Sequence, residues 1–246
     1  TGVLTDQSIA FHVAKMAQEQ GANVVISSRK EDACAAVAEE INAKWAKKGN
    51  KAIPIACNIS HKEQLQALTD KSIDAFGQID VLVCNAAVNP YFGPSKDIPD
   101  SAFDRLMESN VRSNFWLCHM VLPQMVERKD GSITIVSSIG GLRGSPILGA
   151  YCVSKAADMQ LARNLAVEYG PSNIRVNCIA PGLIKTYFAK ALWDNPEILE
   201  RSTAGAPLKR IGMPDEIAGA AVFLASPAGA FMTGQTMVID GGATAS

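Results

Sequence analysis

The sequence has few histidines, few aromatic residues and almost no net charge. Its 246 residues include three histidines, and aromatic residues make up 6%. Because His12, His61 and His119 are far apart in the sequence, a zinc site has little support. The net charge is −1 and there is no basic stripe or lysine run, which argues against nucleic-acid binding. We therefore expect no metal and no nucleic-acid partner.

The sequence also lacks paired cysteines and long apolar runs. Its six cysteines form no C-x-x-C pair, and they are Cys34, Cys57, Cys84, Cys118, Cys152 and Cys178. Three of them lie inside apolar runs, so we expect buried, reduced thiols. No uninterrupted apolar stretch of about 18 residues occurs, and no charged-then-apolar leader precedes the first turn. A soluble, cytoplasmic protein without a membrane partner is the expectation.

What the sequence does contain is an alternation of short apolar runs and helix-like segments. Hydrophobic residues make up 48% of the chain and charged residues 19%, which suits a sizeable core. The apolar runs are 23–28, 51–58, 80–87, 131–138, 174–181 and 235–240, and the helical segments are 8–20, 31–48, 62–76, 100–127, 151–169 and 214–225. Continuous β-branched runs are typical of strands covered on both faces.

This alternation predicts an α/β fold, namely a doubly wound parallel sheet with helices on both faces. No internal repeat, low-complexity tract or linker is present, so we expect a single domain over 1–246. The segment 187–213 has the least regular pattern and is predicted to cover the substrate. A strand is expected before the first turn, and we suspect that upstream residues are missing from this numbering.

The opening stretch TGVLTDQSIA has the rhythm of a phosphate-binding turn that leads into a helix. A helix N-terminus presents unpaired N–H groups and partial positive charge, which suits a pyrophosphate. Gly2 permits a tight turn, and the small Ser8 lets the phosphates approach. Asp6 would repel a phosphate, so it is expected to face solvent or cap the helix. From these residues alone, an ordinary helix cap and a phosphate turn both remain open.

A second stretch, IVSSIGGLRGSPILGAYCVSK, carries a sharper signal. Tyr151 and Lys155 are four residues apart and share one helix face, and Ser138 precedes Tyr151 by thirteen residues. A nearby ammonium favours the phenolate and makes a tyrosine a better proton shuttle at neutral pH. The Ser138 hydroxyl is suited to bind a substrate oxygen as charge develops on it. The alternative is a surface tyrosine that has a lysine nearby by chance.

These motifs resemble the short-chain dehydrogenase/reductase family along nearly the whole chain. The order Ser138, Tyr151 and Lys155 is similar to the active site of its main branch, and Asn110 matches the asparagine that holds a helix bulge and a relay water. Further matches are VCNAAV (83–88), RVNCIAPGLIKT (175–186) and TGQTMVIDGG (233–242). The resemblance implies a Rossmann-type fold, with the catalytic residues Asn110, Ser138, Tyr151 and Lys155.

Two parts of the chain resemble different branches of this family. The turn, with Ser8 and Ile9, is similar to the enoyl-acyl carrier protein reductase branch. Those reductases place six residues between the active tyrosine and lysine, whereas three separate Tyr151 from Lys155, as in alcohol dehydrogenases and ketone reductases. Because this spacing sets which atom is protonated, we predict carbonyl/alcohol redox chemistry and not reduction of a C=C bond.

The resemblance also implies a nicotinamide cofactor, and the sequence favours NADP(H). The second strand ends in SSRK, where members specific for NAD usually have an acid, and Arg29 and Lys30 suit a 2′-phosphate. A solvated charge pair and NAD(H) are the alternatives. The implied cofactor contacts are Gly2, Ser8, Ile9, Ser28, Arg29, Lys30, Asn58, Ile59, Asn85, Ala86, Ala87, Tyr151, Lys155, Pro181, Gly182, Ile184 and Thr186.

The sequence defines the substrate less clearly than it defines the catalytic residues. The expected pocket wall is mostly apolar and comprises 89–93, Leu142, Ile147, Tyr187, Phe188 and Trp193, although these residues also suit a core or a subunit interface. AAVNPYFG and APGLIKT resemble carbonyl reductases that act on ketones, retinoids and dicarbonyls. The alternatives are a 3-oxoacyl thioester reductase, an NAD-dependent alcohol or polyol dehydrogenase and a non-catalytic NADP(H) sensor. By resemblance, the helices at 100–127 and 151–169 pair across the subunits of a homotetramer.

Overall fold

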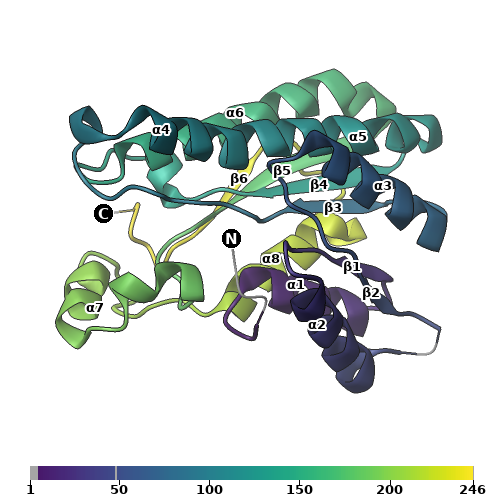
Figure 1. Cartoon of the computed structure of the whole chain (residues 1–246), viewed down its shortest axis with the longest axis horizontal. Coiled ribbons are helices and arrows are strands. Elements are labelled where there is room, and N and C mark those ends of the chain that lie inside the picture. Colours follow the sequence, from purple (N-terminus) through teal and green to yellow (C-terminus); the bar gives the residue numbers. More distant parts are fainter. Residues whose placement is uncertain (1–4, 48, 246) are drawn as a thin grey trace. The chain divides into compact units, whose positions relative to one another are not determined.

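The computed structural model describes residues 5–47 and 49–245, which form two compact units (Figure 1). The first unit comprises Asn58–Ala180 and Phe223–Met237. The second unit comprises the described residues within Gly2–Cys57, Pro181–Val222 and Val238–Ser246.

The first unit is built on a sheet of four strands in the order β3-β4-β5-β6. The strands are β3 (Val81–Cys84), β4 (Gly131–Val136), β5 (Ile174–Pro181) and β6 (Thr236–Ile239). Strands β3, β4 and β5 run parallel, and Cys84 is level with Ile135. All six residues of β4 are buried, the polar Ser132 and Thr134 included, so both faces of this strand are covered.

Helices of the first unit lie along one side of this sheet (Figure 1). They are α3 (Lys62–Phe76), α4 (Asp100–Met107), α5 (Ser113–Arg128) and α6 (Gly149–Tyr169). Leu106, Met125 and Leu165 are buried on these helices, as are Ile133 and Ile135 on β4. Removal of such side chains from water is the main force that holds helices against a sheet.

The single helix expected over 100–127 is instead broken into three segments. Between α4 and α5 lies a π-helical turn, Glu108–Arg112, that contains Asn110. The Asn110 side chain bonds the main chain of Val88, with Oδ1 accepting from its N–H at 2.8 Å and Nδ2 donating to its carbonyl at 2.9 Å. The apolar periodicity of 100–127 did not reveal this break. Such π turns are frequent at functional sites.

The second unit contains two parallel strands and their helices. These elements are α1 (Ile9–Glu19), β1 (Val24–Ile26), α2 (Glu31–Trp45) and β2 (Ala52–Pro54). Phe11, Ile26 and Ile41 belong to their shared core. Asn42 of α2 bonds both main-chain groups of Ala52, with Oδ1 accepting at 2.7 Å and Nδ2 donating at 2.8 Å. These bonds fix α2 beside β2.

The segment 187–213, also in the second unit, contains a helix that the periodicity did not predict. A 3-10 helix, Tyr187–Leu192, precedes α7 (Pro196–Thr203), and α8 (Pro214–Ala225) follows. Asn195 caps α7, because its Oδ1 accepts from the N–H groups of Glu197 at 2.9 Å and Ile198 at 3.2 Å. An Asn-Pro start is a helix signal that an irregular apolar pattern conceals.

Short 3-10 helices lie at Ser95–Asp97, Ile139–Gly141, Gly170–Ser172 and Pro227–Gly229. All six cysteines are free and buried, which confirms the predicted buried thiols. Over residues 5–47 and 49–245, no helix is long and apolar enough to cross a membrane.

Candidate active site

Ser138 and Tyr151 lie next to each other around Gly140 in the first unit. Ser138 follows β4, and its Oγ accepts from the Gly140 N–H at 3.0 Å. A Cβ built on Gly140 would lie 3.4 Å from Ser138 Oγ and 3.8 Å from Tyr151 Cε1. A Cβ on Gly141 would lie 2.7 Å from the main-chain carbon of Lys155, so only glycine fits there. The two glycines therefore allow α6 to approach the end of β4 closely.

Lys155 lies one helical turn after Tyr151 with its ammonium turned inward. The residue is 1% exposed, and Nζ is 5.8 Å from the centroid of the Tyr151 ring. Nζ donates to the Val136 carbonyl at 3.0 Å and to Asp158 Oδ2 at 2.9 Å. The predicted pairing of phenol and ammonium on one helix face is present, and a carboxylate that was not predicted accompanies it.

The electrostatics of this cluster keep the lysine protonated. Burial lowers the pKa of Lys155, but Asp158 and then Tyr151 raise it by more, so its net pKa is raised. Burial raises the pKa of the Asp158 carboxyl, while Lys155 and Asn114 oppose that shift. An ammonium therefore remains beside Tyr151 at neutral pH.

Asn110 joins the loop after β3 to α6. Besides its two bonds to Val88, its Nδ2 donates to Ser154 Oγ at 3.1 Å. Ser154 Oγ in turn donates to the main-chain oxygen of Tyr151 at 2.7 Å. Asn110 thereby fixes the end of the loop that carries Asn85, Ala86 and Ala87, three of the predicted cofactor contacts. Its position in a π turn is the bulge that the resemblance implies.

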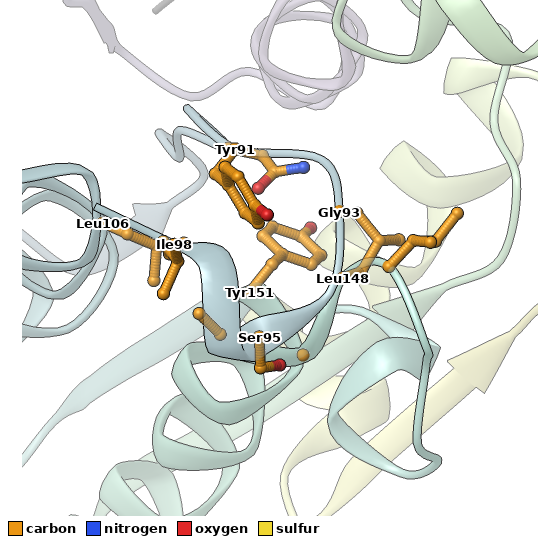
Figure 2. A pocket seen from close by; sticks show the side chains of 11 residues that line it. Tyr91, Gly93, Ser95, Ile98, Leu106, Leu148 and Tyr151 are labelled. Carbon is orange, nitrogen blue, oxygen red and sulfur yellow. The ribbon is translucent and has the colours of Figure 1, made fainter. Parts of the chain in front are cut away.

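A recess beside Tyr151 lies wholly in the first unit. Its lining residues are Asn89, Tyr91, Gly93, Ser95, Ile98, Leu106, Ile147, Leu148, Gly149, Ala150 and Tyr151. Figure 2 shows the Tyr91 and Tyr151 rings next to each other. The Tyr91 hydroxyl donates to the Pro94 carbonyl at 3.1 Å, which fixes this ring. Of the predicted wall residues, Asn89, Tyr91, Gly93 and Ile147 line the recess, whereas Pro90 and Phe92 do not.

The other predicted wall residues are placed differently. Leu142 is 48% exposed and does not line this recess. Tyr187, Phe188 and Trp193 belong to the second unit. Trp193 Nε1 donates to the Thr186 carbonyl at 2.8 Å, so this indole helps to hold the segment after β5 in place.

The predicted phosphate turn begins the second unit. Ser8 is the N-cap of α1, because its Oγ accepts from the Phe11 N–H at 3.2 Å. Asp6 is exposed, as expected, and the first turn of α1 contains no acidic residue. Ser8 is thus a helix cap, and the N-terminus that begins at Ile9 also suits an anion. Gly2 lies outside the described residues.

The predicted 2′-phosphate site follows β1. Arg29 and Lys30 are exposed, and neither forms an ion pair with a carboxylate of the described residues. Ser28 Oγ accepts from the Lys30 N–H at 3.4 Å and lies 3.1 Å from Cys34 Sγ. The turn is therefore anchored by Ser28 while both cations face solvent.

The remaining predicted cofactor contacts are held by main-chain geometry. Asn58 Oδ1 accepts from the Ser60 N–H at 3.2 Å just before α3, and Ile59 lies in that turn. In the second unit, Pro181 ends β5, and a Cβ on Gly182 would lie 2.7 Å from Asp240 Cα. The last two contacts are Ile184, which is paired with Gly212 by an isolated bridge, and Thr186, which is buried.

Comparisons with known proteins agree with this arrangement. A family model described as "Enoyl-(Acyl carrier protein) reductase" matches residues 2–244. Dehydrogenase/reductase SDR family member 4 of Bos taurus is 39% identical over 234 residues, which cover 95% of this chain and 82% of that protein. The chain belongs to the short-chain dehydrogenase/reductase family.

Solved members of the short-chain dehydrogenase/reductase family share its fold. A gluconate 5-dehydrogenase from Burkholderia cenocepacia in complex with NADP and tartrate superposes with a TM-score of 0.91 at 28% identity and covers 99% of this chain and 94% of its own. A 7α-hydroxysteroid dehydrogenase complexed with NADH and 7-oxo glycochenodeoxycholic acid gives 0.89 at 36% identity and covers 96% and 89%. The predicted Rossmann-type fold and membership of a family acting on CH–OH and C=O groups are confirmed.

Two residues of this dehydrogenase/reductase site were missed from the sequence. Asp158 contacts Lys155, and Asn114 Nδ2 donates to Asp158 Oδ1 at 2.9 Å. The signal was available, because Lys155 and Asp158 are three residues apart on one helix and Asn110 and Asn114 are four apart on another. A carboxylate in an apolar helix face is unusual unless it is paired, so this spacing indicates a buried ion pair.

Proposed function

We propose that this chain is a carbonyl reductase that uses NADP(H), with Tyr151 as the general acid. The single observation that carries the proposal is the grouping of Ser138 and Tyr151 around Gly140, with the Lys155 ammonium 5.8 Å from the phenol ring. A hydrogen-bond donor, a proton donor and a fixed cation are the groups that reduction of a carbonyl requires.

Each side chain has a defined task. Ser138 Oγ accepts its capping bond from Gly140, so its own hydrogen is available to the substrate oxygen. A reduced nicotinamide cofactor, when bound, would supply the hydride that the carbonyl carbon accepts. Tyr151 gives its proton to the carbonyl oxygen, which becomes a hydroxyl, and Lys155 stabilises the phenolate that remains. Asn110 keeps the loop at Val88 fixed beside α6.

The residues of the second unit fit a cofactor that carries a 2′-phosphate. Arg29 and Lys30 are exposed cations without ion pairs to the described carboxylates, and the α1 N-terminus has no acid in its first turn. An ionised hydrogen bond to phosphate is worth about 1.5–3 kcal/mol, which favours NADP(H). The two neighbours above hold NADP in one case and NADH in the other, so NAD(H) is the alternative.

The recess beside Tyr151 favours a ketone with an apolar substituent. Ile98, Leu106, Ile147 and Leu148 supply an apolar lining, and the Tyr91 ring lies against Tyr151 (Figure 2). Apolar and aromatic surfaces with few polar groups are typical of small-molecule sites. The neighbours named for gluconate and for a 7α-hydroxysteroid define two other substrate classes, a sugar acid and a steroid.

A substrate panel tests the proposal. The purified chain is mixed with NADPH or NADH and with an aromatic ketone, a 1,2-dicarbonyl, a 3-oxoacyl thioester, a 7-oxo steroid and an enoyl thioester, while cofactor absorbance is followed. Oxidation of NADPH with a ketone or dicarbonyl is expected, and none with the enoyl thioester. Cofactor binding without turnover of any carbonyl would instead identify a sensor.

The Tyr151→Phe variant tests the general acid. It keeps the ring but loses the proton, so kcat is expected to fall about 10²- to 10⁴-fold. The dissociation constant for NADPH, measured by fluorescence titration, is expected to stay within about twofold because the ring and Lys155 remain. Near-normal reduction by this variant would refute the assignment of Tyr151.

Assembly and location are proposed by family resemblance. Phe115 on α5 and Val153 and Val167 on α6 are exposed, which suits the burial of these helices in a homotetramer. Light scattering of the purified chain tests this, and a mass of one subunit would contradict it. A cytoplasmic location is the accompanying proposal.

A further inference from the structure

The turn before α1 is held in shape by contacts and not by glycine. Phosphate turns of Rossmann-type folds are commonly rich in glycine, which adopts the sharp backbone angles that such turns need. No glycine occurs between Thr5 and His12, and Asp6 within this stretch is exposed. Other groups must therefore fix the course of the main chain at this point.

His12, near the start of α1, reaches back to this turn. Its Nε2 lies 2.8 Å from the main-chain oxygen of Asp6, and because a carbonyl only accepts, Nε2 is the donor. The imidazole also packs edge-on against Phe11, with the ring centroids 5.4 Å apart, and Phe11 belongs to the buried core of the second unit. The imidazole is thus anchored on the core and holds the Asp6 carbonyl.

This bond bears on which N–H groups the helix start leaves available. In a helix that began one turn earlier, the Asp6 carbonyl would accept from the Ala10 N–H, four residues further on. Here the carbonyl accepts from the imidazole instead, and the N–H groups of Ile9 and Ala10 have no acceptor among the described residues. Two such N–H groups at a helix N-terminus suit a pyrophosphate.

The rest of the turn is fixed by contacts within the second unit. The Ser8 Oγ and N–H both donate to the Thr5 carbonyl, at 3.0 and 2.9 Å. The Tyr187 N–H donates to the Gln7 carbonyl at 3.3 Å. Three consecutive carbonyls are held in this way, and that of Asp6, in the middle, is the one held by the imidazole.

We propose that His12 is a positioning residue for the cofactor. By holding the Asp6 carbonyl, it fixes the glycine-free turn in the form that presents the Ile9 and Ala10 N–H groups to the pyrophosphate of a dinucleotide. This inference rests on the proposed use of NADP(H). Because His12 acts through the main chain of the turn, it sets the affinity for the cofactor and not the rate of the chemical step.

The test compares two amide replacements of His12 that differ in reach. The glutamine Nε2 is the same number of bonds from Cα as the imidazole Nε2, whereas the asparagine Nδ2 corresponds to Nδ1, which is buried without a partner among the described residues. In fluorescence titrations, His12→Asn is expected to raise the Kd for NADPH about tenfold, and His12→Gln to stay within about twofold of wild type. Unchanged binding by His12→Asn, or equal weakening in both variants, would overturn the proposal.

Two fragments of the cofactor show where the effect arises. Adenosine diphosphate carries the pyrophosphate without a 2′-phosphate, and adenosine 2′-monophosphate carries a 2′-phosphate without the pyrophosphate. In calorimetric titrations, His12→Asn is expected to weaken adenosine diphosphate about as much as NADPH and to leave adenosine 2′-monophosphate within about twofold of wild type. Equal weakening of the two fragments would mean a general loss of structure and would refute a specific role for His12.

A third variant serves where His12→Asn does not fold. His12→Phe keeps an aromatic ring beside Phe11 but has no donor, so the same loss of affinity for NADPH and adenosine diphosphate is expected. Urea denaturation of each variant establishes that the folded chain is being titrated.

Kinetics separate this inference from the proposed function. With the fastest ketone of the panel, the KM for NADPH of His12→Asn is expected to rise about tenfold, while kcat at saturating NADPH does not fall. A lower kcat with an unchanged KM would contradict a role in binding. If the proposed function fails, the wild-type chain itself will not bind NADPH, whereas tight binding by wild type and His12→Asn alike would refute this inference alone.

Discussion

One ion pair from each unit shows how strongly burial changes the role of such a contact. In the first unit, Lys155 and Asp158 are 2% and 0% exposed at the side chain and pair at 2.9 Å. In the second unit, Arg210 and Glu216 are 52% and 38% exposed and pair at 2.6 Å. The shorter contact is the weaker one, because water screens exposed charges and burial strengthens the attraction.

The two ion pairs also differ in which properties of the protein they affect. The buried pair shares its ammonium with the site around Tyr151, so a change in it alters stability and chemistry together. The exposed pair holds the start of α8 through the bond from the Met213 N–H to Glu216. Arg29 and Lys30 are a third case, since they are exposed cations that form no ion pair with a carboxylate of the described residues.

The largest effect is expected when the buried pair is broken. Lys155→Met leaves the Asp158 carboxylate without a cation, and we expect a loss of about 3–5 kcal/mol in the free energy of unfolding at pH 7. Turnover is expected to fall about 10²-fold or more. Because the pKa of Lys155 is raised, the stabilising contribution is present below the ordinary pKa of lysine and disappears at higher pH. Urea denaturation and ketone reduction are the two measurements.

A double variant sharpens this result. Lys155→Met/Asp158→Leu removes both charges, so stability is expected to recover most of the way to wild type while turnover stays low. Recovery of both properties would show that Lys155 has no chemical role. Recovery of neither would mean that packing, and not an unpaired charge, accounts for the loss.

A smaller effect, confined to binding, is expected at Arg29. Arg29→Asp is expected to shift the ratio of kcat/KM for NADPH over NADH by about 10- to 100-fold toward NADH, with thermal stability unchanged. The control, Lys47→Asp, makes the same charge change at another exposed position of the second unit. An unchanged ratio in Arg29→Asp, or equal shifts in both variants, would count against NADP(H) preference.

The features that were predicted correctly are those that depend on local signals in the sequence. The strand at 174–181 and the helix at 62–76 were predicted with their observed bounds, since a continuous buried run and a clean period are local signals. The family resemblance implied that Ser138 and Tyr151 belong to one active site, and the structure places both around Gly140.

Contacts between side chains of different elements were not predictable from local signals. The resemblance implied a bulge at Asn110, but not the bonds from Asn110 to Val88, 22 residues away. The helical spacing of Lys155 and Asp158 was visible in the sequence, but the contact of Asp158 with Asn114, 44 residues away, was not. The helix Pro196–Thr203 was not predicted, and the reason is local. Its start at Asn195 and Pro196 was interpreted as irregular sequence and not as a helix cap.

The smallest effect is expected at the exposed pair, and its pH dependence has a definite sign. Hydrogen bonds from Arg210 and then from the Met213 N–H lower the pKa of Glu216 to about 2. A lowered pKa stabilises the fold above the ordinary carboxyl pKa, and this contribution is lost as the pH falls toward 2. We expect Glu216→Gln to lower the Tm by about 2 °C or less at pH 7, with ketone reduction unchanged and the difference from wild type shrinking as the pH falls from the ordinary carboxyl pKa toward about 2. Glu39→Gln, at an exposed position of α2, is the control and is expected to match wild type throughout. A loss at pH 7 as large as that of Lys155→Met would mean that exposure does not set the strength of these pairs, and the contrast between the two units would fail.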